Sequence, residues 1–245
     1  MFVIELGLNH LGNKKYLNIL FNFFIKSSFD MATIMIHTHE YYVKNPHHII
    51  KKSVYENIIK ICKKNKKKIG LSVCDVKTFT ELEKLNFDFY KLLSISNTNI
   101  ELINMLKLKK KHIYISTGLS SLKKVKKSIE LFKNYKKKSI LHTPMTYDGS
   151  KLNFHKINLF KKFFKIKTGY SNHSNNVNTL YALSSYDPSK IFLYAKPNIG
   201  KKINFPDDKH SFSIDKLENI KLNYLECLGT HRISRETNKT KIFKS

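Results

Sequence analysis

Short apolar runs alternate with longer amphipathic, lysine-rich segments along the 245 residues of the chain. The apolar runs are nearly continuous, which is typical of strands that are buried on both faces of a sheet. They predict eight strands, at residues 2–6, 32–38, 68–73, 89–94, 112–117, 139–143, 166–171 and 190–195. The pattern therefore indicates a sheet that is covered on both sides.

A segment with the hydrophobic period of a helix follows each predicted strand. In the segment 53–65, Val54, Ile58, Ile61 and Cys62 fall on one face of a helix. The last helix is expected to end at Gly229, because glycine is common just beyond a helix C-terminus. Long helical connections between strands imply parallel pairing. The other helices are predicted at residues 14–28, 78–85, 99–106, 121–135, 154–164 and 176–185, and the last at 213–229.

Eight strand–helix units in 245 residues match the size of a small (β/α)8 barrel. The alternative is a doubly wound open sheet, which often carries a glycine-rich dinucleotide-binding loop after its first strand. The stretch "GLNHLG" at residues 7–12 lacks the GxGxxG spacing, so the barrel is favoured. There is no linker and no break in composition. The expected architecture is therefore α/β, a single (β/α)8 TIM barrel, in one domain over residues 1–245.

The formal net charge of +27 raises the question of a nucleic-acid partner. Only two of the 45 basic residues are arginines, Arg232 and Arg235, whereas recognition of bases and phosphates draws heavily on the bidentate guanidinium group. The lysines are also spread over the whole chain. We therefore expect no nucleic-acid partner, and a lysine-rich nucleic-acid binder remains the third alternative.

Three cysteines, Cys62, Cys74 and Cys227, are present in an odd number and at long spacings, without a CxxC pair. This usage favours reduced thiols in a cytoplasmic protein over a disulfide framework or a zinc knuckle. The N-terminus "MFVIELGLNH" has no basic segment typical of a signal peptide. The most apolar stretch, residues 16–26, is interrupted by asparagines and is too short to span a bilayer, so no membrane insertion is expected.

In a (β/α)8 barrel, functional side chains lie where the strands end and the following loops begin. Lys91 offers a point charge for a phosphate or carboxylate group there. The segment 116–120, "STGLS", offers hydroxyl groups ahead of a predicted helix, which suits an anion. Glu5 is the only acid within its apolar strand and suits general acid–base work. Other polar residues at these ends are Asn9, His10, His37, Ser94, Thr117, His142, Tyr147, Ser171, His173, Asp207 and His210.

Each of these residues also has an ordinary structural interpretation. The hydroxyl groups of segment 116–120 can cap the next helix. Lys91 can bury its aliphatic stem and reach solvent, and Glu5 can be a structural hydrogen-bond partner. His173 alone, beside a glycine and serine turn, is typical of a loop histidine that binds nothing.

Six segments, in order along the chain, resemble motifs of the sialic acid synthase family. They cover nearly the whole sequence, and their order is more specific than any single motif. They are "IELGLNHLGN" at 4–13, "FDFYKLLSISNTN" at 87–99, "HIYISTGLSSLKKVKKSIE" at 112–130, "ILHTPMTY" at 140–147, "TGYSNHS" at 168–174 and "DKHSFSID" at 208–215.

The resemblance implies a barrel that condenses phosphoenolpyruvate with the open-chain aldehyde of an N-acylated amino sugar, giving a nonulosonic 2-keto acid. It places a divalent metal, Mn2+ or Mg2+, on His173. A homodimer is a possible assembly, which the sequence does not decide. The catalytic set becomes Glu5, Asn9 and His10, and the substrate-binding set becomes Lys91, Ser94, Ser116, Thr117, Tyr147, Ser171 and His210.

Several positions differ from the family's pattern. Met35 stands where a phosphate-binding lysine is expected, Ser96 replaces an acid, and Pro197 replaces the second metal-binding histidine. His210, His142 or His37 could supply a second ligand instead, since all three are expected at the open end of the barrel. The C-terminal antifreeze-like domain of the family is also not found before Ser245. Two interpretations follow: a divergent synthase, or a non-catalytic relative that binds a sugar or a partner protein.

Overall fold

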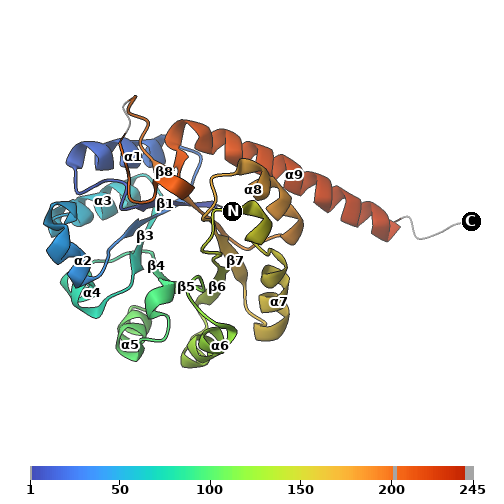
Figure 1. Cartoon of the computed structure of the whole chain (residues 1–245), viewed down its shortest axis with the longest axis horizontal. Coiled ribbons are helices and arrows are strands. Elements are labelled where there is room, and N and C mark those ends of the chain that lie inside the picture. The colour runs from blue at the N-terminus through green and yellow to red at the C-terminus, as the bar shows by residue number, and fades with distance from the viewer. Residues whose placement is uncertain (1, 201–202, 241–245) are drawn as a thin grey trace, which may run out of the picture.

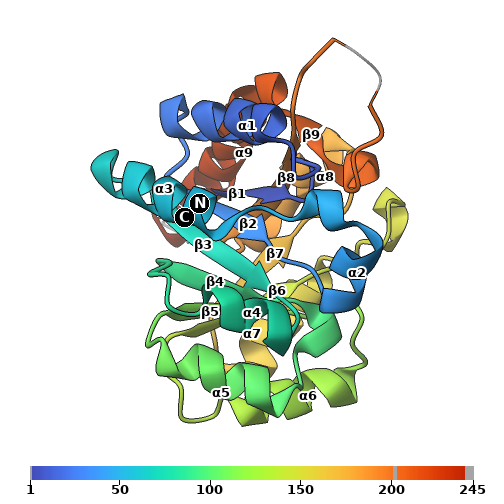
Figure 2. The ribbon, with the colours of Figure 1, turned by 90° about the vertical axis from the view of Figure 1, so that its left-hand side faces the viewer.

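The computed structural model describes residues 2–200 and 203–240. Strands β1 to β8 follow one another in order around a closed parallel barrel, and β1 pairs with β8 to complete the ring. Figure 1 shows the helices placed around this ring, and Figure 2 shows it from the side. The predicted α/β architecture, a (β/α)8 TIM barrel, is therefore confirmed.

The strands lie close to their predicted positions. Their bounds are β1 (Phe2–Gly7), β2 (Met31–Met35), β3 (Lys68–Val73), β4 (Phe89–Leu92), β5 (His112–Ser116), β6 (Lys138–His142), β7 (Thr168–Ser171) and β8 (Ile191–Lys196). The helices between and after them are α1 (Lys14–Lys26), α3 (Lys52–Lys64), α4 (Val76–Leu82), α5 (Ile100–Leu108), α6 (Leu122–Leu131), α7 (His155–Phe164), α8 (Val177–Leu183) and α9 (Ile214–Thr240).

Alternation along the strands divides the interior into layers. Because successive strand residues point to opposite faces, every second residue enters the barrel. An apolar layer inside the barrel is formed by Val3, Met31, Phe89, Tyr114, Leu141 and Phe192. Two residues further along the same strands, the inward positions become largely polar: they are Glu5, Thr33, Lys91, Ser116, Thr143 and Tyr194. The barrel is thus apolar in its middle and polar toward the carboxyl ends of its strands.

Two elements differ from the prediction. Helix α2 (His39–Lys44) follows β2 and was not predicted from the sequence, because it is short and none of its side chains is buried. The prediction that the last helix ends at Gly229 is wrong, since α9 continues to Thr240. Gly229 does not adopt the left-handed conformation that such a cap requires. The far end of α9 extends beyond the barrel in Figure 1. In the part of the chain that is described, no helix has the length and apolarity needed to cross a membrane.

The loop after β8 returns to the barrel. Strand β9 (Phe212–Ser213) pairs in parallel with the end of β8, with Phe212 opposite Ala195. This pairing holds residues 203–211 near the open end of the barrel, where the side chains of Asp207 and His210 meet those of other elements.

The interior of the barrel is tightly packed at Gly70. A Cβ atom at this position would lie 2.3 Å from Cε2 of Phe89, in the apolar layer. We predict that Gly70→Ala lowers the free energy of unfolding by about 1–3 kcal/mol, because the phenyl ring must shift within a filled core. Urea denaturation followed by circular dichroism measures this change.

Gly229→Ala is the matched control, since nothing lies within 4 Å of a Cβ atom there. Alanine should stabilise the continuous helix α9 by up to about 1 kcal/mol. A neutral Gly70→Ala substitution would contradict the packing described for the interior.

Candidate active site

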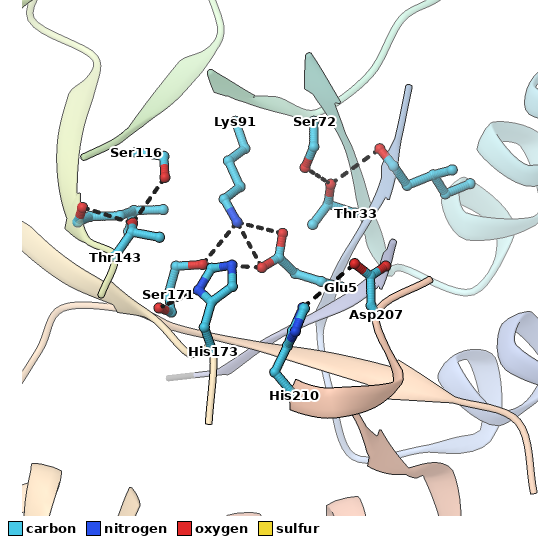
Figure 3. Close-up of polar contacts among 12 residues, drawn as sticks. Glu5, Thr33, Ser72, Lys91, Ser116, Thr143, Ser171, His173, Asp207 and His210 are labelled. Atoms are coloured by element: carbon cyan, nitrogen blue, oxygen red, sulfur yellow. Dashed lines mark hydrogen bonds and ion pairs between the residues drawn. The ribbon is translucent and has the colours of Figure 1, made fainter. Parts of the chain in front are cut away.

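A buried ion pair occupies the polar layer of the barrel. Nζ of Lys91 lies 2.6 Å from Oε1 and 2.7 Å from Oε2 of Glu5, and 2.9 Å from Oγ of Ser171. Lys91 and Glu5 are only 1% and 2% exposed. Figure 3 shows the lysine extending from β4 to meet the carboxylate from β1 and the hydroxyl from β7. Three strands thus supply one charge-balanced cluster.

Aromatic rings enclose the lysine. Its Nζ lies 5.0 Å from the ring centroid of Phe192 and 5.6 Å from that of Tyr194, within the range of cation–π contacts. Burial lowers the pKa of Lys91, and the Glu5 carboxylate acts in the opposite direction. Desolvation of both charges costs free energy that only their close pairing offsets. Removing either partner would leave an uncompensated charge inside the barrel.

A cavity of about 200 Å³ opens above this cluster at the carboxyl ends of the strands. Lys91, Ser94, Ser116 and His173, all predicted from the sequence as site residues, line it. The remaining lining residues are Met35, His37, Cys74, Leu93, Ile95, Leu119, Thr143, Met145 and Tyr194. The cavity therefore combines a buried cation and hydroxyl groups with apolar walls, which suits a small organic anion.

Two histidines meet at this mouth of the barrel. The rings of His173 and His210 lie 4.8 Å apart between centroids, and the ring of Tyr194 contacts both. Burial, followed by the nearby His210 and Lys91, lowers the pKa of His173 to about 3. His173 is therefore a neutral imidazole at physiological pH, which is the form that can bind a metal. Tyr147 stacks on His210 at a centroid distance of 6.0 Å and is half exposed to solvent.

Asn9 fastens the loop that carries His210. Its Nδ2 donates to the carbonyl of Ala195 and to Oγ of Ser211, both at 2.8 Å. Its Oδ1 accepts from the backbone N–H of Asp207 at 3.0 Å. The Asp207 carboxylate in turn accepts from the N–H of Leu8 at 3.1 Å. Asn9 was predicted as a catalytic residue, and these contacts direct its amide to the segment that carries Asp207 and His210.

The turn after β1 is shaped for the Asp207 carboxylate. Gly7 has a φ of +54°, and a Cβ atom there would lie 2.3 Å from Oδ2 of Asp207. Only glycine combines this backbone conformation with such a close approach. The close approach of Asp207 therefore explains why residue 7 in the first sequence motif is a glycine.

Two other predicted site residues face away from the cavity. Oγ1 of Thr117 donates to the carbonyl of Leu141 at 2.9 Å, and its side chain lines a separate groove beside α6 and α7. Thr117 does not line the mouth cavity, because it directly follows Ser116, the last residue of β5, and its side chain lies on the opposite side of the chain. His10 is buried in the turn after β1, where its Nδ1 accepts from Gly12 N at 2.8 Å. It does not line the mouth cavity.

The positions that differ from the family's pattern have definite surroundings. Met35 contributes an apolar wall to the cavity where the resemblance places a lysine. Oγ of Ser96 donates to the carbonyl of Cys74, so it links the segment after β4 to the segment after β3. Pro197 directly follows β8 and is buried, and it has no side-chain donor for a metal. Of the proposed substitute ligands, His142 has its Nε2 2.7 Å from the carbonyl of Leu152 and lines the groove beside α7.

Tyr194 was missed as a site residue in the sequence, whereas Asp207 was named there among the polar residues at the strand ends. Tyr194 lies in an apolar strand, so its sequence context is typical of a core residue. Its place two positions after inward-facing Phe192 could have indicated that it also faces into the barrel. Burial raises the pKa of Tyr194 well above its usual value, so the phenol stays neutral. Asp207 lies in a loop whose path no local pattern predicts.

A divalent metal can be tested against these side chains. Within residues 2–200 and 203–240, no group of three or more His, Cys, Asp or Glu side chains is arranged to hold an ion. The pair His173 and His210 is in contact, however, and both ring nitrogens of His210 are buried without a hydrogen-bond partner among the described residues. The described side chains therefore offer two neighbouring imidazoles and no third protein ligand, so an ion here would take its other positions from water or substrate.

The fold and the site define a (β/α)8 barrel with a polar, partly cationic site at the carboxyl ends of its strands. Within this class, the model of the NeuB family matches residues 26–224, and the chain belongs to the NeuB family. The resemblance to sialic acid synthases seen in the sequence motifs is thereby confirmed at the level of the family.

Solved structures share this fold at low sequence identity. The N-acetylneuraminic acid (sialic acid) synthetase from Leptospira borgpetersenii, in complex with citrate, has a TM-score of 0.82 and 15% identity over 99% of this chain and 92% of that chain. The spore coat polysaccharide biosynthesis protein spsE from Bacillus subtilis has a TM-score of 0.79 and 14% identity, over 100% and 70%.

A truncated 3-deoxy-D-arabino-heptulosonate 7-phosphate synthase from Thermotoga maritima has a TM-score of 0.70 and 11% identity, over 94% of this chain and 87% of that chain. At these identities the likeness shows the fold alone. A comparison with curated protein sequences finds no match.

The buried ion pair predicts a strong energetic coupling. Glu5→Gln and Lys91→Met should each destabilise the protein by about 3–5 kcal/mol, because each leaves the opposite charge buried and unpaired. The double variant should lose less than the sum, with a coupling of about 1–3 kcal/mol by urea denaturation.

The exposed pair Glu130 and Lys133, whose side chains are 70% and 72% exposed, provides the control. The matching Glu130→Gln and Lys133→Met cycle should show no measurable coupling. Additive losses at Glu5 and Lys91 would mean that the two charges do not interact.

Buried neutral histidines predict acid sensitivity. Burial lowers the pKa of both His10 and His142 from 6.5 to about 4. Below pH 6.5 the unfolded chain therefore binds protons that the folded chain does not. The free energy of unfolding should fall from about pH 6.5 toward pH 4, by about 1.4 kcal/mol per pH unit for each histidine.

Urea denaturation at pH 6.5 and pH 5.0 measures this slope. His142→Asn should reduce the slope by the share of one histidine, whatever its effect at a single pH. The same substitution at exposed His155 should leave the slope as in the wild type. An identical slope in wild type and His142→Asn would refute the assignment.

Proposed function

We propose that the chain condenses phosphoenolpyruvate with the open-chain aldehyde of an N-acylated amino sugar to form a nonulosonic, sialic-acid-like acid. The observation that carries the proposal is the buried Glu5–Lys91–Ser171 cluster beneath a cavity at the mouth of the barrel. Membership of the NeuB family and the likeness to a sialic acid synthetase and a heptulosonate phosphate synthase support this class of carbon–carbon bond formation.

In this proposal, different residues at the mouth of the barrel bind the anion and transfer protons. The carboxylate or phosphate of phosphoenolpyruvate binds Lys91, Ser94 and Ser116, where a desolvated ammonium and hydroxyl donors converge. The enol carbon attacks the sugar aldehyde, water adds to the adjacent carbon, and inorganic phosphate leaves, which balances the reaction. As the substrate anion takes over contacts of Lys91, Glu5 is released to take up or supply a proton.

The sugar is expected on the loop side of the cavity. His173 and Tyr147 lie there, with Tyr147 open to solvent and stacked on the His210 ring. A divalent metal, Mn2+ or Mg2+, would polarise the aldehyde oxygen and lower the pKa of a bound water when present. His173 is the protein ligand that the sequence motif assigns to it.

The direct test is phosphate release from phosphoenolpyruvate by the purified chain with Mn2+. N-acetylmannosamine and a bacterial diamino hexose serve as acceptors. Release should depend on the acceptor, and Lys91→Met should lower it about 100-fold or more, because a charge-assisted contact to the anion is lost. His155→Asn, on the exposed side of α7, is the matched control.

Failure to release phosphate with every acceptor, from protein shown to be folded, would refute this function. The second candidate is a non-catalytic relative that binds a sugar phosphate or sugar acid. It is favoured by Met35 in the cavity wall and by the three contacts that already occupy the Lys91 ammonium. Thermal stabilisation by such a ligand without turnover would support it.

A further inference from the structure

A second hollow lies at the amino ends of the strands, at the opposite end of the barrel from the mouth. Its volume is about 860 Å³, compared with about 200 Å³ for the mouth cavity. It is lined by residues at the start of three strands, His112 of β5, Ser139 of β6 and Thr168 of β7. Tyr224 and Leu228 of α9 also line it. The C-terminal helix therefore borders a space that the proposed reaction does not use.

The charge of this hollow is strongly one-sided. Its lining carries four lysines against one acid: Lys161, Lys165, Lys167 and Lys190, with Asp187. The lysines come from the end of α7 and from the residues directly before β7 and β8, so they converge on one concave surface. Lys165 and Lys167 take part in no ion pair between described residues. A concave surface with charges of one sign concentrates the electric field and attracts an ion of the opposite sign.

The cations around this hollow repel one another. Burial, followed by the positive charge of Lys68 and that of Lys167, lowers the pKa of Lys190, while Asp30 acts in the opposite direction. Burial, followed by Lys167 and Lys190, also lowers the pKa of His112 to about 4. An anion bound among these side chains would offset the repulsion, because an opposite charge nearby favours the charged form of each cation.

Uncharged donors line the same space. Oγ of Ser189 is buried and has no hydrogen-bond partner within residues 2–200 and 203–240. Native proteins seldom leave a buried polar atom without a partner, so this hydroxyl points to a ligand independently of the charges. The hydroxyl of Ser139 lies 2.9 Å from Nε2 of His112. Phosphate oxygens accept hydrogen bonds from hydroxyl and ammonium groups alike, so both kinds of donor suit one ligand.

The shape and composition of the hollow favour a small molecule over a macromolecule. No arginine is among its lining residues, whereas recognition of nucleic acids draws heavily on bidentate guanidinium groups. A concave space encloses a small ligand, but a flat membrane surface would meet only its rim. The rings of His112 and Tyr114, 4.5 Å apart between centroids, offer an apolar surface for the organic part of such a ligand.

We propose that a small phosphorylated metabolite with at least two negative charges binds in this hollow between Lys167 and Lys190, with Ser189 donating to a phosphate oxygen. Nucleotides and sugar phosphates share this chemistry. The site is separate from the mouth, since Lys167 precedes β7, whose other end supplies Ser171 to the ion-pair cluster. Binding here does not depend on the proposed reaction. Because α9 lines the hollow, an occupant also stabilises the packing of this helix on the barrel.

Calorimetric titration of the purified full chain with pyrophosphate, ATP and glucose 6-phosphate tests this site. The titrations contain no divalent metal and about 0.15 M salt, which screens distant surface charges. The wild type should bind one equivalent of pyrophosphate, and tighter binding of ATP or of glucose 6-phosphate identifies the organic part. The double variant Lys167→Gln, Lys190→Gln should bind at least tenfold more weakly. The double variant Lys126→Gln, Lys127→Gln, on the exposed face of α6, removes the same charge and should bind as the wild type does.

Lysine acylation read by mass spectrometry keeps the proposal testable if a variant fails to fold. In the wild type, pyrophosphate should protect the exposed Lys165 and Lys167 but not Lys126 and Lys127. Equal weakening in the two double variants, or protection spread over all exposed lysines, would show general attraction to a basic protein and overturn the site. Binding of duplex DNA or anionic vesicles by folded wild type, without binding of any of the three small anions, would overturn it as well.

Discussion

The ion pair between Glu5 and Lys91 is the interaction on which the barrel depends at the carboxyl ends of its strands. Its partners are 86 residues apart and come from β1 and β4, so they meet only when the barrel has closed. Both charges are almost fully desolvated, and neither is tolerable alone in a medium of low dielectric constant. The charges of Glu5 and Lys91 are therefore paired only in the closed barrel. The pair lies in the polar layer, two residues beyond the apolar layer on β1 and β4.

His210, which contacts His173, lies on the loop after β8, and a separate set of contacts holds this loop in place. Strand β9 pairs with the end of β8, and the Asn9 amide bridges β8, Asp207 and Ser211. Lys196 pairs with Asp208 at 2.6 Å near the start of the same segment. These contacts hold the segment that places His210 against His173. The position of His210 therefore depends on the side chain of Asn9, which ties its loop to β8.

Much of the fold was predictable because it depends on local patterns. Few folds are compatible with near-continuous apolar runs separated by amphipathic segments, and eight such repeats in one chain favour a closed barrel. Helix α2 escaped prediction because it buries no side chain and so leaves no periodic signal. Gly229 was misjudged because a glycine marks a helix end only when the backbone turns left-handed, and at this position it does not.

The sequence by itself determined the strand–helix succession, the polar residues at the strand ends and the motifs that place Lys91, Ser116 and His173 at the barrel mouth. Only the tertiary structure decided which of those residues face one another. Ser116, the last residue of β5, lines the cavity, and Thr117, which follows it, lines the groove on the opposite side. Likewise His210 meets His173 through a loop whose course depends on contacts with Asn9, nearly 200 residues earlier in the chain. Such long-range pairings are set by the closed barrel and have no local signal in the order of the amino acids.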